Sequence, residues 1–125
     1  MKKRILIIDD QEDIRQVAAI SLEIVAGWDV SMASSGRDGL AKAASERPDA
    51  ILLDVMMPGM DGPTTFIELQ RQPETAGIPV IFLTANVRAV DRRRLAGIAV
   101  AAILGKPFDP TTLSSQIAGV LGWAN

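Results

Sequence analysis

The sequence contains neither histidine nor cysteine. Without them the chain has no thiol nucleophile, cannot build a Ser-His catalytic triad and lacks the ligands of the usual zinc sites. Any metal ion must therefore be held by oxygen atoms, which favours a hard cation such as Mg²⁺, Mn²⁺ or Ca²⁺. If the protein handles a phosphohistidine, that histidine belongs to a partner.

Long apolar runs and a strong net charge are also missing. No run of about 18 or more apolar residues occurs, as a membrane-spanning helix would need. The opening stretch MKKRILIIDD holds only four consecutive apolar residues, too few for a secretory signal. The net charge of −2 gives no general attraction to nucleic acid or to anionic membranes. We therefore expect a cytoplasmic protein that binds neither a membrane nor nucleic acid directly.

Apolar segments of strand length recur along the 125 residues, a length that suits a single domain over residues 1–125. Four of them are almost continuously apolar, as expected for strands covered on both faces of a parallel sheet. These four segments are residues 5–8, 50–53, 80–83 and 98–104. Residues 28–33 alternate between apolar and polar side chains instead, which is typical of a less buried edge strand.

Helical patterns separate these strands. The first helix is expected to end at Gly27, and its apolar face comprises Ile14, Val17, Ala18, Ser21, Leu22 and Val25. Ser35 marks the start of a second helix, which runs to about Glu46. Pro63 suits the first turn of a third helix, with Phe66 and Leu69 facing inward.

Two more helices complete the pattern: a weaker one over residues 87–96 and a last one capped by Asp109-Pro110. Strand and helix then alternate five times, which predicts an α/β fold with a doubly wound, five-stranded parallel sheet. The expected strand order is 2-1-3-4-5, as in flavodoxin-like folds, because it places the alternating second strand at an edge. Ligands of such sheets bind at the carboxyl ends of strands one and three.

Polar residues gather at the carboxyl ends of four of the five predicted strands. They are Asp9 and Asp10, Asp54, Thr84 and Lys106. Any one of them could simply meet water at a strand end. Three carboxylates at the expected ligand-binding position are harder to explain in that way.

Carboxylates held this close repel each other, by about 4 kcal/mol for a pair 4 Å apart at an effective dielectric constant of 20. Mg²⁺ would relieve the repulsion and would also hold phosphate oxygens. Lys106 supplies a mobile positive charge, and the Thr84 hydroxyl can donate a hydrogen bond to the same oxygens. The set predicts a Mg²⁺-assisted phosphoryl site with an aspartate nucleophile.

The stretches ILIIDDQ, AILLDVMMPGMDG, VIFLTA and LGKPF, in this order and spacing, resemble those of response-regulator receiver domains of two-component signalling. The resemblance covers essentially the whole chain. It implies that Asp54 is the phosphoacceptor. It also implies that Asp10, Asp54 and the main-chain carbonyl of Met56 bind Mg²⁺ or Mn²⁺ directly, with Asp9 helping through a water molecule.

The resemblance further implies how the phosphoryl group is contacted. Lys106 would contact it, and Thr84 would move to bond it. The peptide bond between Lys106 and Pro107 is expected to be cis, since a cis bond there would aim Lys106 into the site.

The turn after Asp54 suits the presentation of a carbonyl group. Pro58 and Gly59 prevent a helix from starting there and turn the chain. Met57 and Met60 are expected to fill gaps under the loop. Asp61 is expected to act as a turn or cap residue rather than as a metal ligand.

The chain departs from the receiver pattern in one respect. Ile103 stands three residues before Lys106, where many receivers carry an aromatic side chain that swings inward on activation. We hypothesise that Thr84 still moves and that the rearrangement beyond it differs. Met56 and Asn86 flank the expected path of the hydrolytic water and offer no carboxylate or base, so we expect slow or moderate self-dephosphorylation.

By resemblance, the phosphoryl donor is a sensor histidine kinase or a histidine phosphotransfer protein that docks at the first helix and the loop after Lys106. A downstream protein or effector domain would read the change. We expect a monomer, with a weak dimer as the alternative. The arginines of residues 87–97 are either a solvated helix face or a docking surface for an acidic partner.

Two other interpretations stay open. A degenerate receiver would serve only for protein contact, but such domains usually lose an acidic residue or the lysine. An aspartyl-phosphate phosphatase needs a second aspartate two residues after the nucleophile, where this chain has Met56 after Asp54 and Gln11 after Asp9. We therefore expect a protein that catalyses only its own phosphorylation and dephosphorylation.

Overall fold

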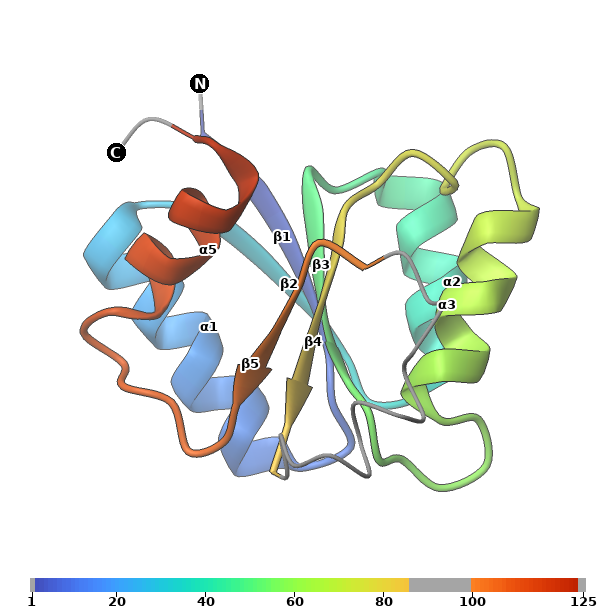
Figure 1. Cartoon of the computed structure of the whole chain (residues 1–125), viewed down its shortest axis with the longest axis horizontal. Coiled ribbons are helices and arrows are strands. Elements are labelled where there is room, and N and C mark those ends of the chain that lie inside the picture. Colours follow the sequence, from blue (N-terminus) through green and yellow to red (C-terminus); the bar gives the residue numbers. More distant parts are fainter. Residues whose placement is uncertain (1, 86–99, 124–125) are drawn as a thin grey trace.

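Five parallel strands form one sheet in the order β2-β1-β3-β4-β5 (Figure 1). This computed structural model describes residues 2–85 and 100–123. The strands are β1 (Arg4–Ile8), β2 (Asp29–Ala33), β3 (Ala50–Asp54), β4 (Val80–Thr84) and β5 (Ala102–Gly105). Their order and direction confirm the predicted doubly wound, flavodoxin-like sheet. They also make β1 and β3 neighbours and place the alternating strand β2 at an edge.

The fifth strand is shorter than the sequence predicts. The apolar run predicted a strand over residues 98–104, but β5 begins only at Ala102, which is in register with Ile81 of β4. Val100 precedes the strand and packs against the hydrophobic core. Its apolar character therefore reflects packing ahead of the strand, while residues 98–99 lie outside the described part of the chain.

Helices cover both faces of the sheet (Figure 1). Helices α1 (Glu12–Ala26) and α5 (Leu113–Leu121) pack on one face, and α2 (Gly36–Glu46) and α3 (Gly62–Arg71) pack on the other. Each face has its own apolar cluster, and alternate side chains of β1 enter one cluster or the other. The helix predicted at residues 87–96 lies outside the described residues. Among those that are described, no helix has the length and apolarity needed to cross a bilayer.

Helix α1 buries a different stripe from the one that its apolar pattern predicts. Ala18, Ala19 and Leu22 are buried, whereas Val17 and Val25 are 44% and 52% exposed. The placement of Val17 and Val25 on the inner face is wrong, because the stripe through Ala18 and Leu22 faces the sheet and the two valines lie on its flank. Gly27 ends the helix in the left-handed conformation, at φ +71°, as predicted.

Side-chain caps begin α2 and α3. The Ser35 hydroxyl accepts a hydrogen bond from the Asp38 N–H (3.1 Å), and the Asp61 carboxylate accepts one from the Thr64 N–H (2.9 Å). Pro63 lies in the first turn of α3. The predicted caps at Ser35 and Asp61 are therefore confirmed.

The start of α5 differs from the prediction. The Asp109 carboxylate accepts from the Thr111 N–H (2.9 Å), and the Asp109 carbonyl accepts from the Leu113 N–H (3.0 Å). These bonds close a turn, and the helix begins only at Leu113. The expectation that Asp109-Pro110 caps the helix directly is wrong, because the polar groups of Asp109 hold the turn that precedes it.

Candidate functional site

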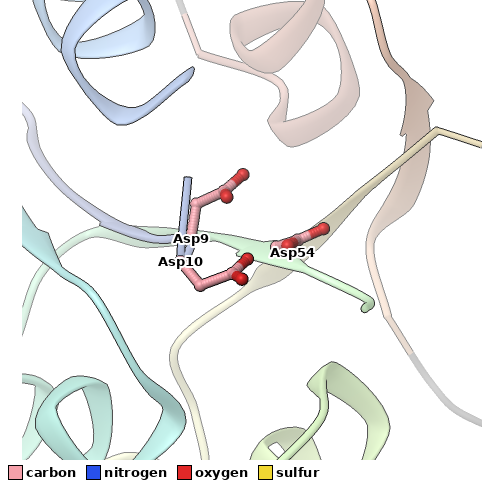
Figure 2. Close-up of side chains that lie close together, drawn as sticks. All are labelled: Asp9, Asp10 and Asp54. Carbon is pink, nitrogen blue, oxygen red and sulfur yellow. The ribbon is translucent and has the colours of Figure 1, made fainter. Parts of the chain in front are cut away.

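Two neighbouring strands lead into carboxylates at the same edge of the sheet. Asp54 is the last residue of β3, and Asp9 follows β1, whose Ile8 is in register with Leu53. Figure 2 shows Asp9, Asp10 and Asp54 gathered at this edge, and one oxygen from each lies within 4.8 Å of the others. Asp9 and Asp54 are buried, whereas Asp10 is exposed. The structure therefore brings together the three carboxylates that were predicted to share a site.

Lys106 follows β5 and places a positive charge among these carboxylates. Its Nζ atom lies 2.9 Å from Asp9 Oδ2 and 3.2 Å from Asp54 Oδ1, and only 9% of its side chain is exposed. The Lys106 N–H donates to the Thr84 carbonyl (2.7 Å), which ties the residue to the end of β4. The peptide bond between Lys106 and Pro107 is cis, as predicted.

Thr84 lies on β4, the strand next to that of Asp54, and Ile103 lies on β5, one strand further out. Thr84 is buried at the end of β4 and is in register with Gly105. Ile103 is in register with Phe82 and packs against the apolar cluster that includes it. An aliphatic side chain thus fills the place where the resemblance suggests an aromatic one. Asn86 and the arginines of residues 87–97 lie outside the described residues.

The surroundings of Asp54 oppose its ionisation. Burial, the negative charge of Asp9 and, to a smaller extent, a hydrogen bond with the Asp10 side chain raise the pKa of Asp54 from 3.8 to about 6, against the opposing pull of Lys106. Burial alone would lower the pKa of Lys106, but Asp9 and Asp54 outweigh it and raise that pKa. The site therefore favours the neutral form of Asp54 and the charged form of Lys106.

The donor atoms of this site suit a hard divalent cation. Three carboxylates supply oxygen atoms, the ligands that Mg²⁺ and Mn²⁺ prefer. The Oδ2 atom of Asp9 is buried without a well-aligned hydrogen bond among the described residues, although the Lys106 ammonium lies 2.9 Å away. The residues therefore fit the predicted metal set of Asp9, Asp10 and Asp54. The role of the Met56 carbonyl as a further ligand stays a prediction.

The methionines in the loop after Asp54 differ in how deeply they are buried. Met57 is 8% exposed and belongs to the core cluster, which confirms it as a packing residue, and Met60 lies beside Gly36. The side chain of Met56 is 63% exposed and therefore contributes little to the core. Gly59 turns the chain at φ +78°, a conformation that disfavours any side chain.

Gly62 supports the site in a way that the sequence pattern did not predict. A Cβ atom at this position would lie 2.4 Å from the Asp54 carbonyl oxygen and 2.8 Å from the Val55 Cα atom. The Gly62 N–H also donates to the Val55 carbonyl (2.9 Å). The start of α3 thus rests directly on the backbone of Asp54. An Asp-Gly pair marks a turn in any sequence, so nothing local signals this close approach.

We predict that Gly62→Ala lowers the free energy of unfolding by about 3 kcal/mol, because main-chain atoms must move to admit the methyl group. Gly119→Ala is the matched control, since a Cβ at Gly119 of α5 meets nothing within 4 Å. That change should raise the stability by about 0.5–1 kcal/mol, because alanine favours a helix. Urea denaturation of both variants checks the contrast. Equal stabilities would show that the close approach at Gly62 is unimportant.

Comparison with known proteins identifies relatives over nearly the whole chain. The sequence model of the response regulator receiver domain matches residues 5–118. The transcriptional regulator RpaA of Synechocystis is 40% identical over 118 residues, which cover 94% of this chain and 48% of that protein. The regulatory protein PhoP of Bacillus subtilis is 36% identical over 123 residues, which cover 97% of this chain and 49% of that protein. The chain thus spans about half the length of these relatives.

Solved structures of similar length share the fold. The chemotaxis protein CheY4 of Vibrio cholerae superimposes with a TM-score of 0.88 at 32% identity, covering 96% of this chain and 99% of that one. A putative response regulator from Chloroflexus aurantiacus gives a TM-score of 0.88 at 29% identity, covering 98% of this chain and 99% of the other. Both likenesses extend over the sheet and its surrounding helices.

Proposed function

Because this chain belongs to the response-regulator receiver domain family of two-component signalling, we propose that Asp54 accepts a phosphoryl group from a partner's phosphohistidine. The observation that carries the proposal is the position of the Asp54 carboxylate, buried beside Asp9 and Asp10 with the Lys106 ammonium 3.2 Å away. A nucleophile, an oxygen-rich cation site and a mobile positive charge meet there.

The chemistry divides among the residues of the site. An oxygen of Asp54 attacks phosphorus as the bond between phosphorus and the imidazole nitrogen breaks, and the leaving nitrogen keeps the electron pair. The Lys106 ammonium contacts the phosphoryl group as it is transferred and balances its negative charge. The Thr84 hydroxyl is the donor that moves to bond it. Asp10, Asp54 and the Met56 carbonyl would hold a divalent cation directly, and Asp9 would hold it through a water molecule; the cation would supply charge neutralisation.

The outer side of α1 offers a surface for the phosphodonor. It exposes Val17, Ile20, Ile24 and Val25, which line a shallow apolar groove with Pro110 and Thr111 of the loop that follows β5. Exposed apolar patches of this kind mark contact surfaces. We infer that a histidine kinase or a histidine phosphotransfer protein docks along α1 and that a downstream protein or effector domain reads the phosphorylated state.

The two alternative functions gain no support from the geometry. A degenerate receiver would have lost part of the acidic set or the lysine, whereas these residues lie in contact here. A phosphatase would need an acid or base two residues after its nucleophile. The exposed Met56 side chain cannot supply it after Asp54, and Gln11 cannot supply it after Asp9. Turnover of an external substrate is therefore not part of the proposal.

Removal of the metal tests the proposal directly. Incubation with acetyl phosphate and Mg²⁺ should add one phosphoryl group to the protein, because the cation neutralises the carboxylates and the incoming phosphoryl oxygens. The same incubation in EDTA should add none. Intact-protein mass spectrometry measures both. An adduct of equal yield in EDTA would contradict the proposed metal dependence, and no adduct in either would favour a degenerate receiver.

A further inference from the structure

The Lys106 ammonium has a third close partner besides the two aspartates. The Gln11 Oε1 atom accepts a hydrogen bond from it at 3.0 Å. An ammonium has three N–H donors, and Asp9 Oδ2, Asp54 Oδ1 and Gln11 Oε1 surround this one at 2.9, 3.2 and 3.0 Å. Asp9 and Gln11 contact the lysine from the connection between β1 and α1, and Asp54 contacts it from the end of β3.

Gln11 occupies the N-cap position of α1 without capping it. No hydrogen bond runs from its side chain to the first turn of the helix. Serine, threonine, aspartate and asparagine are the residues that suit an N-cap, and glutamine is not among them. The Gln11 side chain reaches across to Lys106 instead, while its own N–H donates to Asp9 Oδ1 (2.9 Å). A residue that does not suit its local position in a helix is expected where its side chain has a role in a functional site.

We propose that Gln11 is a positioning residue for phosphoryl transfer, an inference that rests on the proposed function. Lys106 must exchange its contact with Asp54 Oδ1, the longest of the three, for an oxygen of the arriving phosphoryl group. Asp9 then remains as an ion-pair partner and Gln11 as a hydrogen-bond acceptor, and together they keep the ammonium aimed at Asp54. Gln11 does this as a neutral amide, which holds the direction of the lysine without adding a negative charge that would repel the phosphodonor.

Two variants test this role. Gln11→Met keeps the length of the side chain but removes the accepting oxygen. Gln11→Ser also removes it and improves the helix cap. At saturating Mg²⁺ and acetyl phosphate, we expect the rate constant for adduct formation to fall about tenfold in both variants. The half-saturating concentrations of Mg²⁺ and acetyl phosphate should stay unchanged. The unfolding temperature of Gln11→Ser should be equal to or above that of the wild type, which a merely structural role would not produce.

Gln16→Met is the control, because Gln16 lies further along the same helix and donates to Glu12 (3.3 Å). It should react at the wild-type rate. Wild-type rates in both Gln11 variants would overturn the inference while leaving the proposed function intact, and so would a slow Gln11→Ser that is also less stable than the wild type. A wild-type protein that forms no adduct would overturn the proposed function and this inference together.

Discussion

An Asp54→Asn variant is expected to form no phosphoryl adduct under conditions in which the wild-type protein is modified. Asparagine has nearly the shape of aspartate, and its amide oxygen can still accept a hydrogen bond from Lys106. The amide lacks the anionic oxygen that attacks phosphorus, however, and an acyl phosphate cannot form on it. We therefore expect loss of the adduct to below detection rather than a partial reduction.

Asp49→Asn serves as the matched control for this prediction. Asp49 is an exposed aspartate that precedes β3 and accepts from the Arg4 N–H (2.8 Å), at the opposite end of the strand from Asp54. It should be modified to the wild-type extent, as followed by intact-protein mass and by peptide mapping. An adduct that persists in Asp54→Asn and maps to Asp9 or Asp10 would show that a different carboxylate is the nucleophile.

The same Asp54→Asn change is expected to stabilise the metal-free protein above about pH 6. The folded state raises the pKa of Asp54 from 3.8 to about 6, so the ionised carboxylate destabilises the fold. A tenfold change in an acid dissociation constant between the unfolded and folded states corresponds to about 1.4 kcal/mol. Allowing for solvent screening, we expect the variant to gain about 1–3 kcal/mol in free energy of unfolding near pH 8.

The sign of the effect depends on pH in a defined way. Well below pH 3.8 the Asp54 carboxyl is protonated in both the folded and the unfolded state, so it makes no difference to stability. Between that value and about 6 the unfolded state ionises first, and the wild type loses stability as the pH rises. The advantage of the variant should therefore shrink severalfold between about pH 8 and about pH 4.

Urea denaturation in EDTA across this pH range provides the measurement. Asp9, Asp10 and Lys106 face Asp54 and remain in both proteins, so the difference between the two curves isolates Asp54. Added Mg²⁺ should reduce the advantage of the variant, because the cation relieves the same repulsion in the wild type. A constant difference at all pH values would show that Asp54 ionises normally in the folded protein.

Local sequence patterns were sufficient to predict the strand order and the caps of α2 and α3. Unbroken apolar runs mark strands covered on both faces, and the alternating pattern of residues 28–33 marks the edge strand β2. The Ser35 and Asp61 caps were also predictable, because each bond joins residues three positions apart. The inner face of α1 was not, since apolar side chains lie on more than one side of this helix and only packing selects the stripe through Ala18 and Leu22.

By itself, the sequence determined the fold class and the convergence of Asp9, Asp10, Asp54 and Lys106, because the carboxyl ends of parallel strands meet at one edge. The absence of histidine and cysteine also limited any metal site to oxygen ligands.

Only the tertiary structure showed that Gln11 contacts Lys106, 95 residues away, and that Gly62 rests on the backbone of Asp54. It likewise decided the raised pKa of Asp54, which depends on burial and on the distances to Asp9 and Lys106. These features arise from distances between packed elements, and such distances leave no periodic or local signal in a single sequence.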